Sequence, residues 1–162
     1  MKKVRVVIWN EFVHEREEGA AGDYIRTVYP AGIHACLAEK LAAADLEIRT
    51  ATLDEPGQGL PEPVLDETDV LVWWGHCAHD RVDDSLVDRV QQRILAGMGL
   101  VVLFPTQSYQ ESLPIKLFEY MLCGLPVIAS DFPLWRELTG KSCALFVDPQ
   151  KVEEIAGAMT FL

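Results

Sequence analysis

Short apolar runs rich in β-branched residues alternate along this 162-residue chain with segments whose apolar residues recur every three to four positions. The two periodicities belong to strands and helices, and their alternation is typical of a parallel sheet with helical crossovers. The runs lie at residues 4–9, 47–52, 70–74, 100–104, 126–130 and 144–147. The third and fourth runs are almost wholly apolar, which is expected of central strands buried on both faces.

Four helices are predicted between and after these strands. They cover residues 33–44, a segment from Asp83 or Asp84 to Gly97 or Gly99, residues 112–123 and residues 152–159. Residues 55–63 are rich in Gly and Pro and are predicted as a loop. The pattern predicts one α/β domain over residues 1–162, a three-layer α/β/α sandwich with a five- or six-stranded parallel sheet, flavodoxin-like or Rossmann-like. We expect strand order 2-1-3-4-5, with residues 144–147 added at the edge.

Composition narrows the classes of function. Hydrophobic residues make up 49% of the chain, enough for a proper core, which excludes disorder. The net charge of −11 disfavours nucleic acid and anionic membranes as partners. Without a membrane-length apolar run or a signal-peptide pattern, we expect a cytoplasmic protein. Its four cysteines, Cys36, Cys77, Cys123 and Cys143, have no CxxC spacing, and we expect reduced, mostly buried thiols.

The loops after the first and third predicted strands contain most of the imidazole and carboxylate groups that could act in catalysis or bind a ligand. In strand order 2-1-3-4-5 these loops flank the switch point, where open parallel sheets bind ligands. They contain His14, His76, His79 and Asp80. Imidazole and carboxylate groups together suit general acid–base catalysis or a metal ion, although no zinc motif of defined spacing is matched. The alternative is that they cap helices and complete loop hydrogen bonds, and for His34 we favour such a structural role.

A second group of polar residues follows the fourth predicted strand. Glu111 precedes a predicted helix that Ser112 caps, and Glu119 follows eight residues later, on roughly the same helical face. Two such carboxylates can accept hydrogen bonds from two hydroxyls of a sugar or ribose. From spacing alone we favour a structural explanation, a favourable charge at a helix N-terminus for Glu111 and ordinary helix surface for Glu119.

Residues 1–103 resemble the trehalose-utilisation (ThuA-like) family. The matching stretches include residues 8–11, 14–15, 29–34, 50–54 and 69–80. The resemblance implies a flavodoxin-like sheet, a link to disaccharide metabolism, and a site containing His14, His76, His79 and Asp80. The family pattern stops after the fourth strand, where a His-Ser-Gly-His-like stretch is expected and Phe104 to Gln107 stand instead.

Residues 101–162 resemble a different family, the retaining group 1 glycosyltransferases of GT-B fold. The resemblance lies in residues 103–130 and then in Trp135, Arg136 and Glu137. It implies that Glu111 and Glu119 contact a nucleotide-sugar donor. Thr106 would help to hold the sugar or ribose, and the helix N-terminus at Ser112 would offer amides to an anion.

We therefore interpret the chain as a chimera, ThuA-like over 1–103 and glycosyltransferase-like over 104–162, engineered rather than natural. Its first predicted function is that of a folded hybrid without native catalysis, because each half contains only part of the site of the family that it resembles. The alternatives are weak residual binding of a sugar or nucleotide-sugar, with magnesium to offset the acidic charge, and a sugar-metabolism enzyme. No cofactor is predicted, and a metal at the histidine cluster is left open. Exposed apolar side chains at Phe132, Trp135, Phe161 and Leu162 would favour a protein-interaction role, with a homodimer as the expected form.

Overall fold

The computed structural model of the chain describes residues 3–42, 45–75, 77–101, 113, 115–122, 124, 127–140, 144–148 and 150–161. These residues form a six-stranded sheet in the order β2-β1-β3-β4-β5-β6, and every neighbouring pair is parallel. The strands are β1 (Val4–Asn10), β2 (Leu46–Thr52), β3 (Val70–Trp74), β4 (Gly99–Val101), β5 (Val127–Ser130) and β6 (Leu145–Val147). The predicted fold class and strand order are both confirmed.

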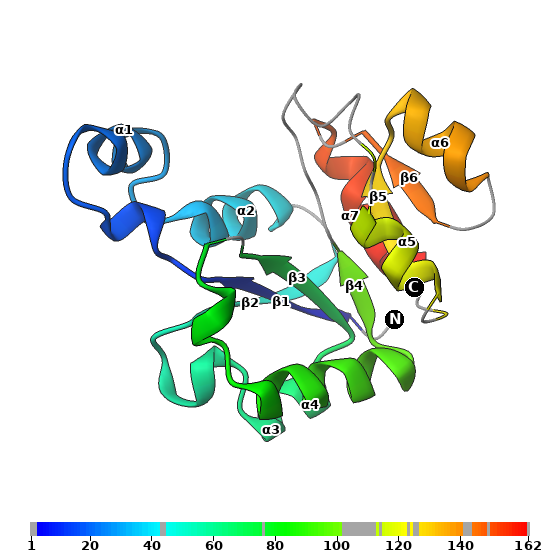
Figure 1. Cartoon of the computed structure of the whole chain (residues 1–162), viewed down its shortest axis with the longest axis horizontal. Helices are drawn as coiled ribbons and strands as arrows, with labels where there is room; N and C mark the ends of the chain where they lie inside the picture. The colour runs from blue at the N-terminus through cyan, green and yellow to red at the C-terminus, as the bar shows by residue number, and fades with distance from the viewer. Residues whose placement is uncertain are drawn as a thin grey trace.

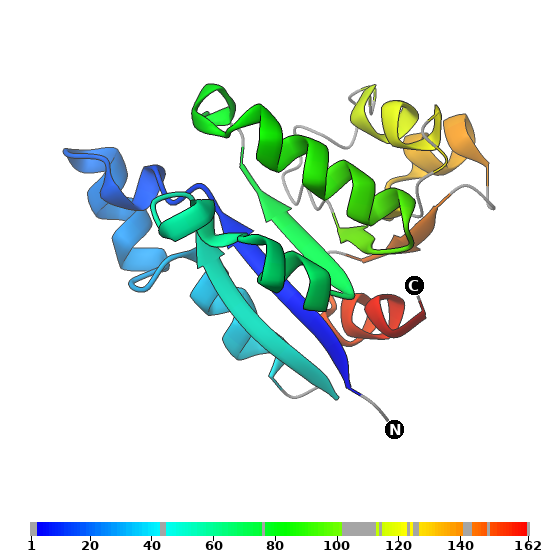
Figure 2. The same cartoon turned by 90° about the horizontal axis from the view of Figure 1, so that it is seen from below.

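Helices cover both faces of this sheet (Figures 1 and 2). One face carries α2 (Ile33–Leu41) and α7 (Val152–Phe161), which also contact each other. The opposite face carries α3 (Glu62–Glu67), α4 (Asp84–Leu95), α5 (Ile115–Leu122) and α6 (Pro133–Thr139). The result is the predicted three-layer sandwich.

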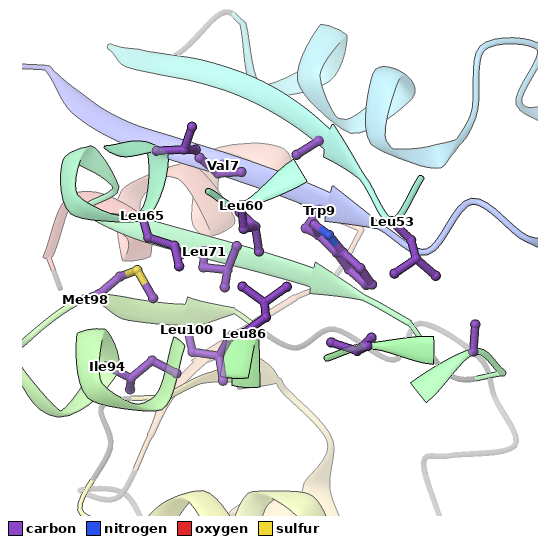
Figure 3. Packing of buried hydrophobic residues seen from close by; sticks show 14 residues of the cluster. Val7, Trp9, Leu53, Leu60, Leu65, Leu71, Leu86, Ile94, Met98 and Leu100 are labelled. Carbon is purple, nitrogen blue, oxygen red and sulfur yellow. The ribbon is translucent and has the colours of Figure 1, made fainter. Parts of the chain in front are cut away.

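Alternating residues of each central strand divide between the two core layers. In β1, Val7 and Trp9 face α3 and α4, whereas Val6 and Ile8 face α2 and α7. Figure 3 shows the first of these layers, in which Leu86 of α4 lies beside Leu71 of β3. Because a strand buried on both faces exposes neither set of side chains, the apolar sequence of β3 follows from its central position.

Three helices were not predicted from the sequence. The first, α1 (Ala20–Val28), lies away from the sheet and packs against the 3-10 turn η1 (His14–Arg16), so it has no long buried stripe (Figure 1). The second, α3, begins inside the segment predicted as a loop. Pro61 and Pro63 flank its first residue, and prolines were one reason for that prediction. Proline fits the first turn of a helix, where no backbone N–H bond is lost. The rest of that loop contains the 3-10 turn η2 (Pro56–Gly59). The third, α6, begins at Pro133 and is only seven residues long.

Two expectations about exposure need correction. Phe132 and Trp135 are not exposed but lie in a small core beneath α5 and α6, with their rings edge to face 4.9 Å apart. Phe161 is exposed as expected. Cys77 is exposed rather than buried and Cys36 is half-buried, while Cys123 and Cys143 lie outside the described residues.

A membrane crossing requires a long and uniformly apolar helix. None of the helices in the described part of the chain meets that requirement.

Candidate functional site

The carboxyl ends of β1 and β3 lie side by side and open into the two loops that the sequence predicts to carry the chemistry. Asn10 and Trp74 are partners in the register of these strands, and the Glu11 N–H donates to the Trp74 carbonyl at 3.0 Å. From β1 the chain passes to β2 on one side, and β3 then forms on the other side. This is the switch point of the sheet, and the crevice between diverging loops at such a point is where open α/β sheets bind ligands.

Glu11 is the buried centre of this arrangement, with 1% of its surface exposed. Its Oε2 accepts backbone N–H groups from Cys77 at 3.2 Å and Ala78 at 3.0 Å, so the carboxylate ties the β3 loop to the end of β1. A Cβ added to Gly75 would lie 3.2 Å from that same Oε2. The loop therefore approaches Glu11 so closely that a larger residue at position 75 would displace its neighbours by a few tenths of an ångström. Phe12 next in the chain has φ 54°, a left-handed conformation found disproportionately at functional sites.

His14 and Cys77 meet beside this carboxylate. The Cys77 Sγ–H donates to Glu11 Oε1 at 2.8 Å, and Sγ lies 3.8 Å from His14 Nε2. The other ring nitrogen of His14 lies 3.7 Å from a carboxylate oxygen of Glu17. Desolvation of the thiol, with its hydrogen bond to Glu11, raises the pKa of Cys77 to about 11. The Cys77 thiol is thus protonated at neutral pH and is a poor nucleophile.

A hollow of about 520 Å³ opens over His14 and Cys77. That volume is within the range of small-molecule sites. Four charged side chains line it, namely Arg16, Glu17, Asp54 and Arg81, and Phe12 and Val13 complete the wall. Both arginines bind the single carboxylate of Asp54. With Glu17 as the second carboxylate, the two positive and two negative groups of the lining balance one another.

A second polar cluster lies buried beneath the same loops. The Asn10 side-chain amide donates at 2.9 Å both to Glu15 Oε1 and to His34 Nδ1. Since Asn10 Oδ1 accepts the Phe12 N–H, this orientation of the amide is fixed by its partners and His34 is neutral with its proton on Nε2. Desolvation lowers the pKa of His34, against a smaller opposite effect of Glu15. The structural role expected for His34 agrees with these contacts.

The predicted catalytic residues do not all converge. His14 lines the hollow, but His79 and Asp80 are exposed in the 3-10 turn η3 (His79–Arg81) and are not among its lining residues. The His79 Nε2–H donates to the Gly75 carbonyl at 2.9 Å, which is a loop hydrogen bond. His76 lies outside the described residues.

The predicted sugar-binding residues fall largely outside the described part of the chain. Thr106, Glu111 and Ser112 are outside it, and Glu119 lies in α5 with its side chain not described. The described strand β4 ends at the carboxyl edge of the sheet, the same edge as the hollow.

Glu11 and Cys77 were not among the site residues predicted from the sequence. Both lie in the loops after the first and third strands, but the prediction there rested on the histidines, whose side chains are common in catalysis. The signal that could have identified Glu11 is a carboxylate directly after a strand that reads as a buried parallel strand. A charge in that position must find donors, and the facing loop is where they are.

The comparisons with known proteins concern the second half of the chain. Residues 83–162 match the family model of the group 1 glycosyl transferases. The match covers 80 of the 162 residues and includes α4 to α7 and β4 to β6. The glycosyltransferase-like segment therefore begins about 20 residues earlier than the expected boundary near residue 103. A search of curated proteins found no match.

Nothing in these comparisons bears on the ThuA-like resemblance of residues 1–103 or on a chimeric or engineered origin. Both stay predictions, as does the division of the chain into two halves of different ancestry. The homodimer expected from the sequence is likewise untested. Of the four residues on which it rested, Phe132 and Trp135 are buried, Phe161 is exposed, and Leu162 lies outside the described residues.

Proposed function

We propose that this chain binds a nucleotide-sugar at the carboxyl edge of its sheet, through its glycosyltransferase-like segment. The observation that carries the proposal is the match of residues 83–162 to the group 1 glycosyl transferases. The parallel pairing of β4 and β5 supports it, because the two strands end at one edge, the edge where α/β sheets hold their ligands.

Glu111 and Glu119 are the residues proposed to hold the donor, by accepting hydrogen bonds from its sugar or ribose hydroxyls. Thr106 adds a hydroxyl, and the amides that follow Ser112 suit an anionic phosphate. The net charge of −11 repels a diphosphate, so the proposal includes Mg²⁺ as a counter-ion. We expect a dissociation constant in the millimolar range, equivalent to about −4 kcal/mol.

The test is a thermal-shift and calorimetric titration of the full chain with UDP-glucose and GDP-glucose, with and without Mg²⁺. A ligand that binds only the folded state raises the melting midpoint. We expect a rise in midpoint with Mg²⁺ that Glu111→Gln and Glu119→Gln each remove, while their midpoints without ligand stay near that of the wild type.

The matched control is Glu67→Gln, which makes the same chemical change to an exposed residue at the end of α3, on the amino side of the sheet. This variant should respond to ligand as the wild type does. The proposal is wrong if millimolar nucleotide-sugar produces no shift and no heat, or if both site variants bind as well as the control. The folded hybrid without a ligand would then be favoured.

A sugar-metabolism activity at His14, His76, His79 and Asp80 stays a prediction from the ThuA-like resemblance. The described residues favour His14 alone among these for contact with a ligand, because it lines the hollow.

A further inference from the structure

Three potential metal ligands from two loops converge at the switch point, outside the segment proposed to bind nucleotide-sugar. They are Glu11 Oε1 and His14 Nε2 from the β1 loop and Cys77 Sγ from the β3 loop. One ligand atom of each of these three residues lies within 4.8 Å of a ligand atom of the other two. We propose that Glu11, His14 and Cys77 form a binding site for one divalent transition-metal ion of the zinc class.

The separations between the ligand atoms suit such an ion. With metal–ligand bonds of about 2.0 to 2.3 Å, tetrahedral geometry places ligand atoms about 3.3 to 3.6 Å apart. Sγ is 3.8 Å from the imidazole nitrogen and 2.8 Å from the carboxylate oxygen. The shorter distance is that of a hydrogen bond whose proton lies between the two ligands. A bound ion would take the place of this proton, which passes to solvent, and Glu11 and Cys77 would separate by under about 1 Å.

Protein groups surround the Glu11 carboxylate and the His14 ring. The Cys77 N–H lies 3.2 Å from both oxygens of Glu11, and Oε2 also accepts the Ala78 N–H at 3.0 Å. His14 Nδ1 lies 3.7 Å from a Glu17 carboxylate oxygen. A carboxylate near the far nitrogen is the usual support of a metal-binding histidine, since it selects the tautomer and orients the ring. Glu11 Oε1 and His14 Nε2 are the atoms that approach Sγ.

The donor set identifies the class of metal. One carboxylate oxygen, one imidazole nitrogen and one thiolate sulfur suit Zn²⁺ and similar ions, whereas Mg²⁺ and Ca²⁺ prefer oxygen alone. Three protein ligands leave a fourth tetrahedral position. His14 and Cys77 line the hollow of about 520 Å³, so that position is accessible to water or a small ligand, as in catalytic rather than structural zinc sites.

The experiment is a titration of the full chain with Co²⁺ after removal of metals by a chelator. Thiolate coordination produces a sulfur-to-cobalt charge-transfer absorption in the near ultraviolet, and tetrahedral geometry produces intense visible bands. We expect both to saturate at one equivalent per chain and to disappear when Zn²⁺ is added.

The variants separate the site from adventitious binding. Cys77→Ser should remove the charge-transfer band, and His14→Ala should weaken Co²⁺ binding at least tenfold. Glu17→Gln should weaken it about tenfold or more, as loss of a supporting carboxylate usually does. Cys36→Ser changes the half-buried thiol of α2 and should alter none of these signals. His14 and Cys77 are not in the core, so circular dichroism should show folded variants.

The proposal is overturned if Co²⁺ binds without a charge-transfer band, if the band survives Cys77→Ser, or if His14→Ala binds with wild-type affinity. These outcomes are independent of nucleotide-sugar binding, which is tested on Glu111 and Glu119. Either proposal can therefore fail while the other stands.

Discussion

His34 is a buried histidine whose ring accepts a hydrogen bond from the Asn10 amide and packs edge to face on Phe12. Desolvation lowers its pKa in the folded chain below the value of about 6.5 that applies to the unfolded chain. As the pH falls through 6.5, the unfolded state takes up a proton that the native state does not accept. The free energy of unfolding must therefore decrease, until the pH passes below the folded pKa.

We predict that His34→Gln reduces this loss of stability between pH 7.5 and pH 5. Glutamine presents an oxygen to the Asn10 amide and carries no titrating group. Urea unfolding at several pH values gives the slope, and His79→Gln, at an exposed histidine, should keep the wild-type slope. An equal slope in the His34 variant would mean that another group causes the acid sensitivity.

At the scale of single residues, the sequence shows which side chains could take part in chemistry, but not which groups they contact in the fold. It gave the same weight to His14, which lines the hollow, and to His79, whose ring donates a hydrogen bond to the Gly75 carbonyl. Glu11 and Cys77 are 66 positions apart, and their hydrogen bond depends on how two loops meet. The periodicity of apolar residues along the chain contains no information about which residues of two distant loops come into contact.

At the scale of elements, prediction succeeded where a helix or strand has one buried stripe or two buried faces. All six strands and the helices α2, α4, α5 and α7 were anticipated, with ends that differ by a few residues. Of the helices that were missed, α3 and α6 have six and seven residues and begin at or beside prolines, so they contain too few turns to show a period. The helix α1 is as long as α2, but of its residues only Gly22 is buried, so it has no buried stripe.

The helix α4 is the element that joins the two halves of the sequence. It lies within the glycosyltransferase-like match, yet its Leu86 and Ile94 pack against Val7 and Leu71 in the first half (Figure 3). Its position explains how the three-stranded part of the sheet formed by β2, β1 and β3 is covered.

We predict that Leu86→Ala lowers the free energy of unfolding by about 2 to 5 kcal/mol, the usual range for a leucine truncated in a core. Leu86 has 1% of its surface exposed, whereas the adjacent Val87 has 51%. Val87→Ala should therefore change stability by about 0.5 kcal/mol or less. Urea denaturation measures both, and a cost for Leu86→Ala as small as that of its neighbour would show that α4 does not hold this layer.

At the scale of the whole molecule, the beginning of the family match divides the sheet as well as the sequence. Residues before Asp83 supply β2, β1 and β3, which are neighbours, and residues after it supply β4, β5 and β6, which are also neighbours. The two blocks are joined by the β3–β4 pairing, by α4, and by Tyr120, which packs against the core layers of both.

Because these connections run through the core, we predict one cooperative unfolding transition. In Trp135→Phe, the remaining tryptophans Trp9, Trp73 and Trp74 report on the first block alone. Their fluorescence should give the same urea midpoint as far-ultraviolet circular dichroism, which reports on both blocks. Separate midpoints would mean that the blocks unfold independently.

The central position of β3 also has a consequence for how the chain is made. On the ribosome, residues 70–74 emerge before residues 99–101, so β3 can pair with β1 while its other edge still has no neighbour. That edge belongs to the sequence Val-Leu-Val-Trp-Trp, with no charge or proline to discourage a foreign strand. For the time needed to synthesise about 27 further residues, roughly one to five seconds, the nascent chain exposes an apolar strand edge. Aggregation during expression should therefore depend on translation speed across this interval and on chaperones that bind extended apolar segments.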